Sequence, residues 1–178
     1  MKYLYSILLL CLVLACSKKQ KTFDSLEFSF CSTFNEVYSM KITNNDTIYV
    51  YHHWMSMDFH SGKTPFKLYQ MYAGVMCEND RKKLDKLIGS DGLNLFLPNY
   101  YENFEDGSFY AINLVKENTD KTIFVHARNV PAALDSLAGF LYDLKHRILL
   151  MPVNKTISFK TAGAVVPPPI KFDLIKQQ

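Results

Sequence analysis

The chain has 178 residues, 48% of them hydrophobic and 14% aromatic, and its 20 basic and 17 acidic side chains give a formal net charge of +3. A charge this small and this evenly mixed argues against a nucleic-acid partner. The length suffices for one domain with a buried core, and the many aromatic residues favour β-sheet over disorder.

The N-terminus combines one cation, Lys2, with an apolar run over residues 3–14. As a helix this run rises only about 18 Å, whereas the hydrocarbon core of a bilayer is about 30 Å thick. The run is therefore too short to span a membrane. A short apolar run after a basic start is typical of a secretory signal peptide.

The end of that run, Val13-Leu14-Ala15-Cys16, resembles the lipobox of bacterial lipoproteins, whose cysteine is acylated and becomes the first residue of the mature chain. The resemblance implies a signal peptide over residues 1–15, a lipid on Cys16 and a polar tether over residues 16–22. Ser17 is not the aspartate that the resemblance associates with retention in the inner membrane. We therefore expect a lipid anchor in the periplasmic face of the outer membrane. The alternative, a buried N-terminal helix that ends in an ordinary cysteine, stays open.

Two cysteines follow the tether, Cys31 and Cys77. An oxidising envelope compartment permits a disulfide between them, and two cysteines allow a single intramolecular pairing. The alternative is two free thiols that pack as small hydrophobic side chains. Pairing depends on the Cα separation, which sequence does not supply, so both alternatives remain.

The first half of the mature chain predicts a strand, a hairpin, another strand and a short helix. Apolar and polar residues alternate in the strands, Asn and Asp supply the hairpin turn, and Gly89 follows the helix where a positive φ is favoured. The predicted ranges are a strand at 26–30, a hairpin of 38–42 with 47–52, a strand at 66–73 and a helix at 81–88.

The second half predicts another hairpin and the main helix. The helix opens near Pro131, and its apolar residues recur at spacings of three and four at Leu134, Leu137, Leu141, Leu144 and Ile148. The predicted ranges are a hairpin of 109–115 with 121–126 around a turn at 117–120, a helix from about 129 to 147 and a last strand at 156–160. Three consecutive prolines at 167–169 predict an extended segment in a mobile tail.

This order of elements predicts one α+β domain over residues 23–160, followed by a tail over residues 161–178. The sheet is expected to be largely antiparallel, built from two hairpins plus flanking strands, with two helices packed on it. The element order and the lipobox together resemble small lipoproteins of Bacteroides-type bacteria that carry a domain of unknown function. That resemblance implies no catalytic residues.

One segment of the first hairpin carries candidate metal ligands. In an extended strand, His53, Met55 and Met57 alternate and would share one face. Thioether and imidazole groups suit Cu(I), which gives the hypothesis of periplasmic copper binding. The alternative is that Met55 and Met57 fill the core and that the histidine is solvated.

The same hairpin also offers a candidate binding face at Tyr49, Tyr51 and Trp54. Motifs for serine acyl transfer are absent from the sequence, and the Gly-Lys-Thr at 62–64 lacks the glycine that a phosphate loop needs at position 57. We therefore expect a non-enzymatic module without a cofactor, which binds another envelope protein or a small ligand. A hydrolase assembled from dispersed residues stays open as an alternative.

Overall fold

The computed structural model describes residues 22–33, 35–55, 69–103 and 107–166. The strands are β1 Ser25–Ser32, β2 Glu36–Thr43, β3 Thr47–Met55, β4 Met71–Val75, β5 Asn99–Tyr101, β6 Ser108–Lys116, β7 Thr119–His126 and β8 Met151–Pro152. The helices are α2 Glu78–Ile88, α3 Ala132–Arg147 and α4 Ala162–Val165.

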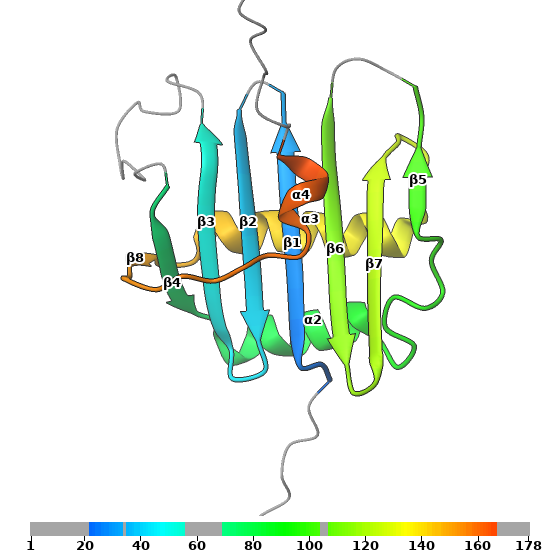
Figure 1. Cartoon of the computed structure of the whole chain (residues 1–178). Coiled ribbons are helices and arrows are strands. Elements are labelled where there is room, and N and C mark those ends of the chain that lie inside the picture. The colour runs from blue at the N-terminus through cyan, green and yellow to red at the C-terminus, as the bar shows by residue number, and fades with distance from the viewer. Residues whose placement is uncertain (1–21, 34, 56–68, 104–106, 167–178) are drawn as a thin grey trace, which may run out of the picture.

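The strands of the described residues form one sheet in the order β5-β7-β6-β1-β2-β3-β4-β8. Neighbouring strands are antiparallel, apart from the parallel pair of β5 and β7. Helices α2 and α3 run across the strands on one face, and α4 lies on the other (Figure 1). The predicted α+β class with a largely antiparallel sheet is confirmed.

β1 lies at the centre of the sheet because both hairpins pair with it. Phe28 opposes Met40 of β2 on one side and Ile112 of β6 on the other. The β2–β3 turn contains Asp46 with a φ of 66°, and the β6–β7 turn contains Glu117 with a φ of 53°. The second turn is tighter than predicted, since β7 already begins two residues later.

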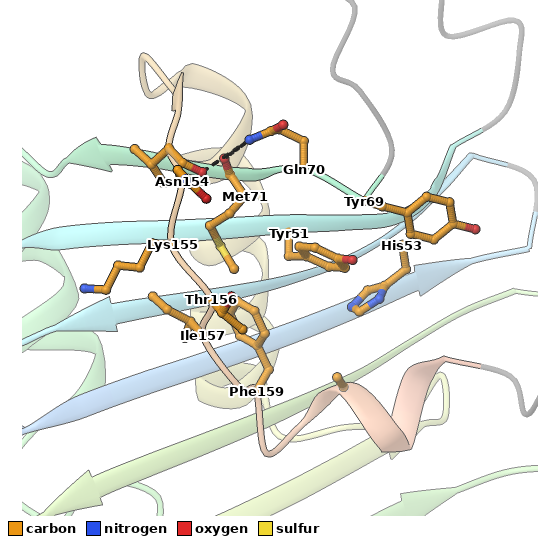
Figure 2. A pocket seen from close by; sticks show the side chains of 12 residues that line it. Tyr51, His53, Tyr69, Gln70, Met71, Asn154, Lys155, Thr156, Ile157 and Phe159 are labelled. Atoms are coloured by element: carbon orange, nitrogen blue, oxygen red, sulfur yellow. Dashed lines mark hydrogen bonds between the residues drawn. The ribbon is translucent and has the colours of Figure 1, made fainter.

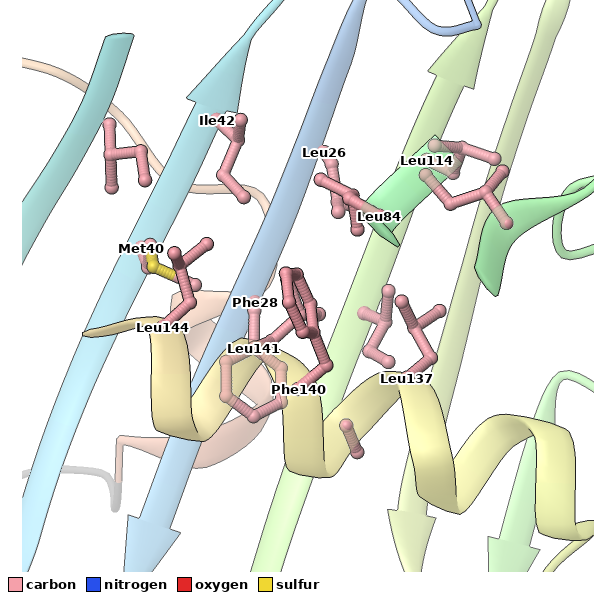
Figure 3. Close-up of a cluster of buried hydrophobic side chains, with 14 of the residues drawn as sticks. Leu26, Phe28, Met40, Ile42, Leu84, Leu114, Leu137, Phe140, Leu141 and Leu144 are labelled. Atoms are coloured by element: carbon pink, nitrogen blue, oxygen red, sulfur yellow. The ribbon is translucent and has the colours of Figure 1, made fainter. Parts of the chain in front are cut away.

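The face that carries α2 and α3 holds the hydrophobic core (Figure 3). Every second residue of the central strands points into it, as expected for a pleated sheet with one apolar face. The core residues labelled in Figure 3 are Leu26, Phe28, Met40, Ile42, Leu84, Leu114, Leu137, Phe140, Leu141 and Leu144. The predicted apolar stripe of the main helix is therefore the surface that α3 buries.

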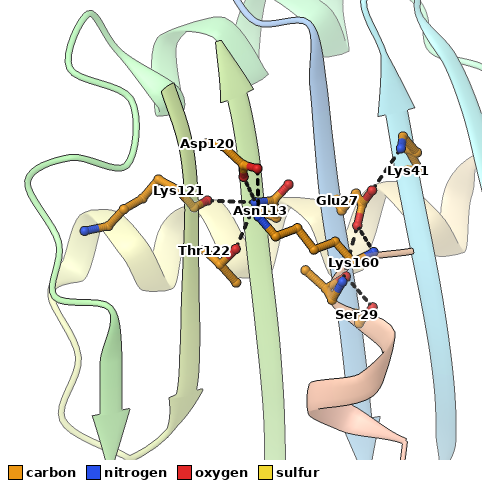
Figure 4. Close-up of polar contacts among 9 residues, drawn as sticks. Glu27, Ser29, Lys41, Asn113, Asp120, Lys121, Thr122 and Lys160 are labelled. Atoms are coloured by element: carbon orange, nitrogen blue, oxygen red, sulfur yellow. Dashed lines mark hydrogen bonds and ion pairs between the residues drawn. The ribbon is translucent and has the colours of Figure 1, made fainter. Parts of the chain in front are cut away.

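The opposite face of the central strands carries buried polar residues beside a small apolar cluster of Cys31, Val37 and Ala111 with Val165. Residues 153–166, which we call the strap, cross this face (Figure 1). The carboxylate of Glu27 accepts hydrogen bonds from the backbone N–H of Lys160 at 2.6 Å and from that of Thr161 at 3.3 Å. The Thr161 hydroxyl lies 2.7 Å from the Ser29 hydroxyl, and Lys160 Nζ lies 2.7 Å from Asp120 (Figure 4). These contacts fix the strap to β1 and β7.

The strap corrects two predictions for the C-terminal half. No strand forms at 156–160. The short β8 is the edge strand beside β4, and the chain then leaves this edge of the sheet to cross its face. Residues assigned to the tail also pack: Thr161 and Val165 are each 1% exposed, and the latter lies in α4. Farther upstream, the strand predicted at 66–73 begins only at Met71, and residues 66–68 lie outside the described part.

Cys31 and Cys77 are both free in this structure, so it does not contain their candidate disulfide. Cys31 is buried near the end of β1, whereas Cys77 is exposed at the start of α2. The end of β1 and the start of α2 lie at opposite ends of the sheet (Figure 1). Among the described helices, none is both long enough and apolar enough to cross a bilayer.

Candidate functional site

A cavity of about 540 Å³ lies on the strap face, between the strap and the β3–β4 side of the sheet. β3 contributes Tyr51 and His53, whose rings meet edge to face with centroids 5.0 Å apart. Tyr69 and Gln70 enter from the residues that precede β4. Figure 2 shows the side chains of Tyr51, His53 and Tyr69 gathered at one end of this cavity. The strap closes the other side with Val153, Asn154, Lys155, Thr156, Ile157, Phe159 and Ala162.

A second cavity, of about 480 Å³, adjoins the first, since His53 and Tyr69 line both. Its remaining lining is mostly apolar and comes from β1, β2, β3, β6 and the end of the strap: Cys31, Ser32, Thr33, Val37, Trp54, Phe109 and Val166. Each volume falls within the range of about 300–1,000 Å³ that is usual for small-ligand sites. We refer to the first as the polar cavity and to the second as the apolar cavity.

A β-bulge at His53 joins the two cavities. The register between β2 and β3 pairs Tyr38 with His52 but Val37 with Trp54, so His53 is an extra residue without a cross-strand partner. A bulge of this kind interrupts the strict alternation of side chains between the two faces. Trp54 therefore lines the apolar cavity together with His53, instead of pointing to the helix face.

His53 is held by a chain of hydroxyl groups beneath the cavities. Its Nε2 lies 2.9 Å from the Ser39 hydroxyl, which lies 2.7 Å from that of Ser29. Ser29 in turn meets Thr161 of the strap. Burial lowers the pKa of His53 from its ordinary value of 6.5, so the neutral ring prevails at pH 7. The ring therefore offers one donor nitrogen and one acceptor nitrogen.

The described lining of the two cavities holds few charged side chains. Among the described residues that line them there is no carboxylate, and the single basic side chain besides His53 is Lys155. Its Nζ donates a hydrogen bond to the Tyr49 hydroxyl at 2.9 Å and lies 4.4 Å from the centroid of the Tyr49 ring. Figure 2 shows the Lys155 side chain extending away from Tyr51 and His53. This arrangement suits a ligand that carries no charge, because a buried charge needs a partner.

The structure brings the predicted binding face together, with one difference. Tyr51 lines the polar cavity and Trp54 the apolar one, whereas Tyr49 lies on the same face under Lys155. Sequence reasoning missed Tyr69, Gln70 and the whole strap. The strap could not be recognised as a cavity wall, because its alternating pattern is equally that of a strand.

The candidate copper ligands are only partly described. His53 is in place, but the side chain of Met55 and all of Met57 lie outside the described residues, as does Cys16. The regular alternation on which the copper hypothesis depended is interrupted by the bulge at His53. Within the described part of the chain, no group of three or more His, Cys, Asp or Glu side chains is placed to hold a metal ion. Copper binding stays an untested prediction.

A second cluster of ionisable groups lies on the helix face, where β2 meets the end of α3. Glu36 and Lys145 are 1% and 3% exposed, and Lys145 Nζ lies 2.5 Å from one carboxylate oxygen of Glu36. His146 Nε2 lies 2.9 Å from the other oxygen. The Lys145–Glu36 pair is buried away from solvent and joins α3 to the sheet, so its role is structural.

Two comparisons of the sequence with known proteins give no relative. No protein-family model matches the chain, and no curated protein matches it. What the site can do therefore follows from its own geometry.

Proposed function

We propose that this protein is a lipid-anchored, non-enzymatic binding module of the bacterial cell envelope, which holds a small ligand between its sheet and its strap. The observation that carries the proposal is the pair of adjoining cavities that share His53 and Tyr69. Aromatic and aliphatic walls with a few uncharged polar groups are typical of sites that bind small molecules. The lipid anchor is proposed from Cys16 and the lipobox-like residues that precede it.

The burial of Ser39, which contacts His53, supports a binding role over hydrolysis. Ser39 is bonded to His53 as a nucleophile would be to its general base, but it is 0% exposed. Ser29, next in the hydroxyl chain, is also 0% exposed. A nucleophile must reach its substrate, so this chain of hydroxyl groups is better suited to holding the His53 ring and the strap in place.

The anchor is tested by the Cys16→Ser variant expressed with its own signal. Only a thiol accepts the lipid, so the variant should remain uncleaved and unlipidated. The mature wild-type protein should partition into detergent and carry the mass of its acyl chains. Recovery of a soluble, unacylated mature chain from wild-type cells would refute the anchor and leave the cavities untouched.

Ligand binding is tested separately on residues 17–178, which contain the whole described sheet and both core helices. N-phenyl-1-naphthylamine, an uncharged fluorescent apolar probe, should bind saturably. Tyr69 is 74% exposed, lines both cavities and has a φ of 59°, so Tyr69→Asn removes its ring while keeping a residue that tolerates this backbone.

The matched control for this variant is Tyr101→Asn. Tyr101 is 61% exposed and lies in β5, across the sheet from the cavities. The probe should bind more weakly to Tyr69→Asn than to wild type, and normally to Tyr101→Asn. Absence of saturable binding, or an equal loss in both variants, would refute the binding site.

A further inference from the structure

The joined cavities differ in chemistry from one end to the other. The apolar cavity presents Val37, Phe109 and Val166 beside the Trp54 ring. One of its few hydroxyl groups, that of Thr33, already donates to the backbone carbonyl of Gly107 at 2.9 Å. A polar ligand group placed in the apolar cavity would find few hydrogen-bond partners, so this end fits an alkyl or aryl body.

The polar cavity offers hydrogen-bonding groups without charge. The Gln70 amide nitrogen lies 3.2 Å from the carbonyl of Met71 and 3.2 Å from that of Val153, which leaves its own amide oxygen as an acceptor (Figure 2). Asn154 and Thr156 line the same cavity from the strap. This end fits a group that both donates and accepts hydrogen bonds.

The residues around the polar cavity disfavour a charged head group of either sign. Among the described lining residues, the one basic group besides His53 that a carboxylate would meet is Lys155, whose ammonium group donates to the Tyr49 hydroxyl and lies over the Tyr49 ring. An ammonium ion would meet no carboxylate among the described lining residues. An ammonium ion would lose hydration without gaining a partner, and a carboxylate would gain one only by drawing Lys155 away from Tyr49, so either charge weakens binding.

On this basis, and given the proposed binding function, we propose that the two cavities together take one elongated, uncharged amphipathic ligand. Its alkyl or aryl body lies in the apolar cavity against Trp54, it passes between His53 and Tyr69, and its amide or hydroxyl head lies in the polar cavity beside Gln70.

Trp54 is the single tryptophan of the chain, and it lines the apolar cavity, so its fluorescence reports on occupancy there. Octanamide, octanoate and octylamine share one chain and differ only in head-group charge at pH 7.5. Titration of residues 17–178 should give an affinity for octanamide at least about tenfold higher than for either ion. From hexanamide to octanamide, each added methylene should raise the affinity about fourfold while it enters the apolar cavity.

Three variants test the position of the ligand and the charge argument. Tyr69→Asn should weaken octanamide binding and Tyr101→Asn should not, since only the former lies where the cavities meet. Octanoate binding that equals or exceeds that of octanamide, particularly if Lys155→Met abolishes it, would overturn the uncharged class while leaving the binding function intact. Failure of all three octyl ligands and of the naphthylamine probe would overturn both.

Discussion

The buried pair of Glu36 and Lys145 gives the sharpest stability prediction. Burial by itself raises the pKa of Glu36, but His146 and Lys145 outweigh burial and hold that pKa below its ordinary value. For Lys145 the balance is opposite, because burial lowers its pKa more than Glu36 raises it. A buried ion pair of this kind is often close to break-even as a unit, although each charge depends on the other.

Lys145→Met should destabilise the domain by about 3–5 kcal/mol, because the Glu36 carboxylate stays buried without its Lys145 cation and keeps only the partly exposed His146. Glu36→Leu together with Lys145→Met should recover most of that loss, since no uncompensated charge remains. The control is Lys82→Met, which removes an exposed partner 3.0 Å from Glu78 on α2 and should cost less than about 1 kcal/mol.

Urea unfolding of residues 17–178 at pH 7 measures these differences as midpoint shifts at constant slope. At that pH Glu36 is charged, because its pKa lies below its ordinary value. Its contribution to stability is therefore present above the ordinary pKa and is lost as the pH falls through the lowered folded pKa. A loss below about 1 kcal/mol for Lys145→Met, or a double variant no better than the single one, would refute the reasoning.

Three further predictions concern Gly74 of β4, the fastening of the strap by Glu27, and His53. Gly74→Ala should destabilise the fold by about 1–3 kcal/mol in thermal unfolding, because the added Cβ would lie 2.7 Å from the Leu149 carbonyl oxygen. The control is Gly139→Ala, whose Cβ would meet open space. In the same assay it should stabilise α3 by about 0.5–1 kcal/mol. Glu27→Gln should weaken the charge-assisted bonds to Lys160 N–H and Thr161 N–H and speed amide hydrogen exchange in the strap; unchanged exchange there would contradict the anchoring role. Octanamide affinity should be constant at neutral pH and fall as the pH drops through the lowered pKa of His53, below 6.5, since the ligand favours the neutral ring; a His53→Gln variant that keeps the same pH profile would assign the effect to another group.

The helix face of the fold could be predicted from the sequence because its helix and its strands each show a clear apolar face. The stripe of Leu137, Leu141 and Leu144 has the period of a helix, and the strands opposite it alternate with a period of two. Packing the two apolar faces together puts these side chains in one core. The α+β class and both hairpins follow from that constraint.

The strap face could not be predicted in the same way. In residues 156–160 the half-buried Ile157 and Phe159 alternate with the exposed Thr156 and Ser158, as in a strand at the edge of a sheet. An extended segment that lies flat on a sheet buries every second side chain too, so the pattern is the same while the hydrogen bonds differ. The bulge at His53 likewise has no signal of its own, because it is set by the pairing of β3 with Val37 and Tyr38.

The polar cavity follows from how the strap is fastened at its two ends. Near β4, the Val153 N–H donates to the Met71 carbonyl at 2.9 Å; near β1, Glu27 binds Lys160 and Thr161. Between these points residues 154–159 span the tyrosine side of β3, where the described bond is that of Lys155 to Tyr49. A segment held at both ends but not paired along its length leaves room between itself and the sheet. The buried polar residues Glu27 and Ser29 of β1, which an ordinary core would exclude, therefore fasten the strap that forms one wall of the cavity.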